Sequence, residues 1–121
     1  MKHPAVCHWE LMGKNGDKTR EFYGKLFDWE IKKWQESDYG MVEAGGEGTI
    51  GGGLGGANEN EPLGLMVYIM VDDLDKYLAK AESLGGKKKL GPTPIPGIGH
   101  FALLTDPDGI TVGLFTPGQQ G

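Results

Sequence analysis

The predicted order of secondary structure elements occurs twice in this chain of 121 residues. In each half, a short β-prone run precedes an amphipathic helix, and three further strand-like runs follow. We expect the elements of the first half at 6–11, 17–27, 28–34, 39–44 and 49–54, and those of the second at 65–71, 74–84, 87–90, 101–105 and 110–115. This repeat predicts an α+β domain of two β-α-β-β-β modules, which form a cup-shaped, half-open mixed sheet with the helices on its outer face.

The modules are expected at residues 5–56 and 64–117, with a polar, turn-rich connector at 57–63 between them. Asp17 is the predicted N-cap of the first helix and Asp72 or Asp73 that of the second, which Gly85-Gly86 is expected to end in a left-handed conformation. Apolar residues at helical spacing predict one core-facing stripe on each helix: Thr19, Phe22, Tyr23, Leu26 and Phe27 on the first, and Leu74, Tyr77, Leu78, Ala81 and Leu84 on the second. We expect a rigid, proline-rich loop at 91–99 and a tight turn at 106–109.

Charge and composition exclude several partners. The chain has 17 acidic and 12 basic residues, for a net charge of −5, and this balance argues against nucleic-acid binding. The basic run 87–89 is interpreted as a solvated strand edge. No segment is apolar for the roughly 20 residues that a membrane span needs. Cys7 is the single cysteine, which predicts no intrachain disulfide and favours a reducing, cytoplasmic location.

Six segments together carry a resemblance to a known superfamily. They are 7–11 (CHWEL), 20–29 (REFYGKLFDW), 68–75 (YIMVDDLD), 94–99 (PIPGIG), 106–109 (DPDG) and 113–115 (GLF). In this order and spacing the sequence resembles the vicinal oxygen chelate superfamily, which includes glyoxalase I, bleomycin resistance proteins and extradiol dioxygenases. The resemblance covers nearly the whole chain. It implies the cup-shaped fold, a homodimer to which Trp29 or Trp34 contributes, and, in metal-dependent members, a metal held by four inward-facing side chains.

Carried over position by position, the four metal-ligand places of the superfamily fall on His8, Gly53, Tyr68 and Gly113. Only His8 is a good ligand, because glycine has no side chain and a neutral tyrosine is a poor partner for a divalent cation. We therefore expect no metal and no cofactor at this site. The two glycines are interpreted as positions that enlarge a cavity and let a flat ligand approach the backbone; tight strand packing is the alternative.

Strand alternation places the polar candidates on one face. His8 and Glu10 share a face of the first strand, whereas Cys7, Trp9 and Leu11 point to the other and suit core packing. The predicted ligand-binding residues are His8, Glu10, Gly53, Tyr68, Met70, His100, Gly113 and Phe115. His100 joins this set if the turn at 106–109 pairs Thr105 with Ile110.

Three functions remain open at this point. The first is a metal-independent, glyoxalase-like or bleomycin-resistance-like protein that binds a small, partly apolar or aromatic molecule. The second is a metal-dependent lyase or dioxygenase with an atypical ligand set of His8, Glu10 and either Glu43 or His100. The third is a dimeric scaffold whose cavity is vestigial. The fold cannot choose among them, because one scaffold hosts many activities.

Overall fold

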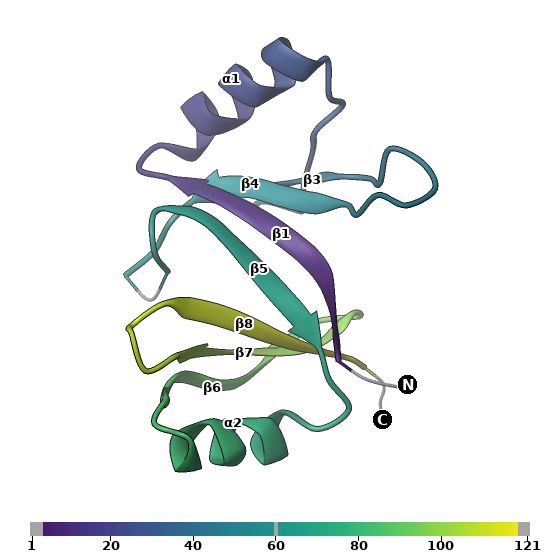
Figure 1. The fold of residues 1–121 in the computed structure, drawn as a ribbon. Coiled ribbons are helices and arrows are strands. Elements are labelled where there is room, and N and C mark those ends of the chain that lie inside the picture. The colour runs from purple at the N-terminus through teal and green to yellow at the C-terminus, as the bar shows by residue number, and fades with distance from the viewer. Residues whose placement is uncertain (1–3, 60, 119–121) are drawn as a thin grey trace. The chain divides into compact units, whose positions relative to one another are not determined.

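The computed structural model describes residues 4–59 and 61–118. The elements follow the predicted order β-α-β-β-β twice, so the α+β class is confirmed (Figure 1). The first set is β1 (Ala5–Gly13), α1 (Gly16–Phe27), β2 (Lys32–Lys33), β3 (Tyr39–Val42) and β4 (Gly52–Gly56). The second set is β5 (Gly64–Met70), α2 (Leu74–Ser83), β6 (Lys87–Ile95), β7 (Gly99–Thr105) and β8 (Thr111–Pro117). No helix in the described ranges has the length and apolarity needed to span a membrane.

Two compact units make up the chain. One spans His8–Met66, and the other joins residues 67–118 to the described residues before His8. Each unit contains one helix and a mixed sheet, and each is described by itself below.

The sheet of the first unit is centred on β4. β1 runs parallel to β4, β3 runs antiparallel to β4 on its other side, and β2 pairs with β3. The register aligns Glu10, Gly53 and Met41 in one row, and Leu11, Leu54 and Gly40 in the next. Side chains of successive rows point to opposite faces of a sheet.

The row that contains Gly40 faces α1, because a Cβ at Gly40 would meet the Arg20 Cδ atom at 2.8 Å. The row that contains Glu10 and Gly53 therefore lies on the opposite face, which we call the helix-free face of the first unit.

The prediction that an apolar stripe of α1 faces the core is wrong. Phe22, Leu26 and Phe27 are 59%, 56% and 53% exposed, and the buried residues of the helix are Gly16 and Arg20. The reason is that a glycine and an arginine stem allow the helix to lie on β4, and the stripe is turned away from that contact.

Arg20 holds α1 in this position. Its Nη2 atom donates to Asp17 Oδ1 at 2.6 Å and to Asp38 Oδ1 at 2.9 Å, and its Nη1 atom donates to the Leu54 carbonyl at 3.4 Å. Arg20 is 8% exposed, and its guanidinium group is hydrogen-bonded to two carboxylates and a carbonyl, as a buried polar group requires. The exposed rings of Phe22 and Phe27 instead belong to a chain of aromatic contacts, in the order Phe22, Tyr23, Phe27, Trp29 and Trp9.

The helix caps correct one prediction and confirm two. Asn15, not Asp17, is the N-cap of α1, and its side chain accepts from the Lys18 amide at 3.1 Å. Asp17 lies in the first turn, where its charge still suits the positive end of the helix. Asp73 caps α2 as predicted, through a bond from the Lys76 amide at 3.1 Å. Gly85 follows α2 with a φ of +100°, in the left-handed conformation expected of a glycine there.

The second unit has a conventional apolar core. β5 runs parallel to β8, and β7 lies antiparallel between β8 and β6. In this unit the predicted helix stripe is confirmed at Leu74 and Leu78, which are 5% and 4% exposed, but it is wrong at Leu84, which is 69% exposed. They pack in one cluster with Val71, Ala102 and Leu114. α2 therefore covers the sheet face that carries Ala102 and Leu114.

Three strand boundaries differ from the prediction. β2 is only two residues long, because the chain leaves α1 through its C-cap Asp28 in the left-handed conformation (φ 58°) and the Trp29 amide still donates to the Gly24 carbonyl. β4 begins later than expected, at Gly52. β6 runs on to Ile95 through the segment predicted as a loop; it is an edge strand with register shifts, where proline is tolerated.

Candidate functional site

The helix-free face of the first unit carries a histidine–tyrosine pair. His8 Nε2 and the Tyr39 hydroxyl oxygen lie 2.7 Å apart, so one of them donates a hydrogen bond to the other. Burial lowers the pKa of His8, because desolvation disfavours the charged imidazolium. A neutral imidazole keeps one nitrogen as acceptor and one as donor.

Glu10 lies two residues further along β1, on the same face as His8. It is 6% exposed, and its Cα partner on β4 is Gly53. The prediction that His8, Glu10 and Gly53 share a face is therefore confirmed by the register. This patch of sheet therefore carries the buried carboxyl group of Glu10, the neutral imidazole of His8 and the phenol of Tyr39.

The space above Gly53 is filled, which corrects the prediction of an enlarged cavity. A Cβ at Gly53 would overlap the Tyr39 hydroxyl and ring, and a Cβ at Gly55 would come within 3.1 Å of Tyr39 Cδ1. The Tyr39 side chain therefore lies along β4, above these two glycines, and reaches His8 with its hydroxyl group. On the other face, a Cβ at Gly52 would overlap the Trp9 ring. The glycines of β4 thus accommodate aromatic rings on both faces.

Gly113 in the second unit also accommodates an aromatic ring. It is the Cα partner of Tyr68, and a Cβ there would overlap the Tyr68 ring. Tyr68 is 6% exposed and packs edge-on against Phe101, with ring centroids 6.2 Å apart. Phe101 in turn pairs with Phe115, whose partner on β5 is Met70. The register thus brings together the four predicted residues Tyr68, Met70, Gly113 and Phe115 on one sheet face.

His100 does not join that face. The turn pairs Thr105 with Thr111 rather than with Ile110, so His100 lies opposite Thr116. It is exposed, and strand alternation places it on the face opposite to Phe101 and Phe115. The turn itself has the predicted chemistry: Asp106 Oδ1 accepts from the amides of Asp108 and Ile110, each at 2.9 Å.

The residues at the superfamily's ligand positions do not fit a metal ion. Two of them are glycines covered by the Tyr39 and Tyr68 rings, and His8 uses Nε2 for Tyr39. Within residues 4–59 and 61–118, no three His, Cys, Asp or Glu side chains come together as a metal site. The alternative set of His8, Glu10 and Glu43, which lie in one unit, is therefore not assembled; His100, the other candidate third ligand, belongs to the second unit.

Cys7 does not form a nucleophile–base pair with His8. It is half-buried, and burial raises the pKa of its thiol, which disfavours the reactive thiolate.

Comparison with known proteins identifies the family. The profile of the Glyoxalase/Bleomycin resistance protein/Dioxygenase superfamily matches residues 5–114. The chain belongs to this superfamily. A superfamily relative from Mycobacterium bovis, named Putative glyoxylase CFP32, is 35% identical over 83 residues. The match covers 69% of this chain but 31% of that protein, so the chain spans about a third of the curated relatives it matches.

Solved structures share the superfamily fold. A glyoxalase/bleomycin resistance protein/dioxygenase superfamily member from Vibrio splendidus has a TM-score of 0.63 at 14% identity, over 96% of this chain and all of that one. The Mn(II)-bound glyoxalase from Novosphingobium aromaticivorans has a TM-score of 0.58 at 20% identity, over 92% of this chain and 37% of that one. At these identities the likeness concerns the fold alone.

Tyr39 and Phe101 are the residues that the sequence did not suggest. The one available signal for Tyr39 was the glycine density of β4, since a glycine opposite an aromatic on a neighbouring strand is where a ring can lie flat. Phe101 follows once the β7–β8 register is known.

Proposed function

We propose that this superfamily member binds a small, partly aromatic molecule without a metal, on the helix-free face of the first unit. The observation that carries the proposal is the bond between His8 Nε2 and the Tyr39 hydroxyl above Gly53. It gives the histidine a protein partner at Nε2, one of the two ring nitrogens through which histidine binds metals. The Tyr39 ring beside it supplies stacking surface for an aromatic ligand.

The chemistry of the patch favours a neutral ligand. Burial lowers the pKa of His8, so its imidazole is neutral and carries no positive charge. A neutral aromatic amide or phenol matches this chemistry, whereas an anion gains no charge pairing from a neutral imidazole. Tyr68, Met70 and Phe115 of the second unit remain predicted ligand contacts. The homodimer and the cytoplasmic location also remain predictions.

Thermal unfolding with a panel of neutral aromatic amides and phenols tests the proposal. A ligand at ten times its Kd stabilises the native state by about 1.4 kcal/mol. Tyr39→Phe removes the hydroxyl group and retains the ring, so we expect affinity to fall roughly threefold to tenfold. His100→Gln is the matched control; it changes an exposed residue of the other unit and should alter affinity less than about twofold.

A metal titration provides the contrary outcome. Zinc, nickel, manganese and iron(II) are titrated into the purified chain and into His8→Gln. Tight, stoichiometric binding that is lost in His8→Gln would overturn the proposal in favour of a metal enzyme. Equal affinity of Tyr39→Phe and the unaltered chain for every bound aromatic would also overturn it.

A further inference from the structure

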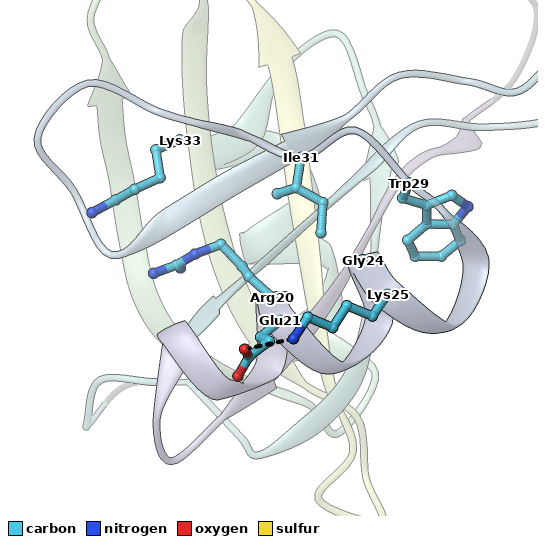
Figure 2. Close-up of a pocket in the computed structure, with 7 residues that line it drawn as sticks. All are labelled: Arg20, Glu21, Gly24, Lys25, Trp29, Ile31 and Lys33. Carbon is cyan, nitrogen blue, oxygen red and sulfur yellow. Dashed lines mark hydrogen bonds and ion pairs between the residues drawn. The ribbon is translucent and has the colours of Figure 1, made fainter.

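A concave surface lies on the α1 side of the first unit, between α1 and β2 (Figure 2). This groove has a volume of about 310 Å³ and is lined by Arg20, Glu21, Gly24, Lys25, Trp29, Ile31 and Lys33. Lys33 pairs with Gly40, whose row faces α1, whereas Glu10 and Gly53 belong to the helix-free face. The groove is therefore separate from the patch around His8.

The lining of the groove is positive in a protein whose net charge is −5. Three of its side chains are cationic and one is acidic. Lys25 Nζ already bonds Glu21 Oε2 at 3.1 Å, and Arg20 is occupied by Asp17 and Asp38. Lys33 differs from both, because its ammonium group makes no ion pair with any residue in the described ranges.

The opposite end of the groove is apolar and rigid. Trp29 and Ile31 are half-buried there, and Figure 2 shows Ile31 between the Lys33 and Trp29 side chains. Trp29 is fixed by ring contacts to Trp9 and Phe27, with centroids 5.5 Å and 5.0 Å apart. Gly24 keeps this part open, because a Cβ there would come within 3.3 Å of Ile31 Cδ1.

We propose that this groove binds a small amphipathic anion, namely a single aromatic ring or short aliphatic body that carries a carboxylate. The carboxylate pairs with the Lys33 ammonium group, and the apolar body lies against Ile31 and Trp29. The volume is at the lower end of the range for small-molecule pockets, roughly 300–1,000 Å³, which suits a one-ring ligand. The combination of one available cation and one apolar wall selects this chemistry over a neutral or cationic ligand.

Titration of the ¹⁵N-labelled full chain with phenylacetate tests this site, with chemical shifts of the Trp29 indole and of the 29–33 backbone as the readout. Lys33→Gln removes the cation, and we expect Kd to rise roughly threefold to tenfold. Lys32→Gln is a matched control: the same change at the neighbouring residue, which points to the other face of the strand and should alter Kd less than about twofold. The neutral analogue 2-phenylacetamide should bind the groove at least about threefold more weakly.

Three outcomes would overturn the proposal: equal effects of Lys33→Gln and Lys32→Gln, equal affinity for phenylacetate and its amide, or no shift at 29–33 at about 10 mM phenylacetate. Shifts confined to His8 and Tyr39 would place the anion on the helix-free face instead, and would also contradict the neutral-ligand preference proposed there. Because the two sites have separate reporter residues and opposite charge preferences, failure of one does not imply failure of the other.

Discussion

Replacing Gly53 by alanine tests whether the glycine exists to accommodate the Tyr39 ring. The added Cβ would overlap the hydroxyl end of the ring, which lies above β4 and bonds His8. The ring must swing away and lose that bond, and overpacking of this kind costs about 1–3 kcal/mol. Alanine regains about 0.5–1 kcal/mol over glycine within a strand. We therefore expect a net loss of about 1–2 kcal/mol in the free energy of unfolding.

Urea unfolding followed by circular dichroism measures this loss. Gly45→Ala is the matched control, because its Cβ would meet only Thr49 Oγ1, at 4.0 Å, and should change stability by less than about 0.5 kcal/mol. In a Tyr39→Ala background the steric conflict is gone, so Gly53→Ala should be neutral or stabilising by up to about 1 kcal/mol. A loss that persists undiminished in that background would refute the reasoning, as would an unaltered stability of the single variant.

Three further changes are predicted to alter stability in different ways. Arg20→Met removes the buried cation that links α1 to the sheet and should cost about 1–3 kcal/mol in urea unfolding, whereas Asp17→Asn, at a side chain 86% exposed, should cost less than about 1 kcal/mol. Asp73→Ala removes the N-cap of α2 and should lower the free energy of unfolding by about 0.5–2 kcal/mol; an equal loss in Asp72→Ala would contradict the capping assignment. The pKa of His8 is lower in the folded chain than its ordinary value of 6.5, so its contribution to stability is present above pH 6.5 and is lost as pH falls toward the folded pKa. Between pH 7.5 and 5.5, the free energy of unfolding in urea should therefore fall less in His8→Gln than in the unaltered chain.

The parts of the fold that the sequence predicted correctly are those in which one local pattern has one physical solution. Leu74 and Leu78 recur at helical spacing beside a β-rich segment, and they are buried as predicted. Asp73 and Gly85 have the chemistry of a helix start and a helix end, and they occupy those places. In α1 the same reasoning failed, because the buried stem of Arg20 and the absence of side chains at Gly16 and Gly40 reorient the helix.

Only one feature of the site could be predicted from the sequence: which residues of one strand share a face. That His8 and Glu10 share a face follows from the period of a strand. That Tyr39 reaches His8 does not, because it depends on the β3–β4 register and on the direction of the ring along β4. His100 was misplaced by a one-residue error in pairing, which moves a side chain to the other face of the sheet.

The Tyr39–Gly53 contact also constrains how this chain could change over evolutionary time. A donor side chain introduced at position 53 alone would collide with the phenol ring, and loss of Tyr39 alone would remove the histidine's partner without supplying a donor. A longer side chain at position 53 therefore requires a change at Tyr39 as well, so the two positions are coupled and are expected to change together.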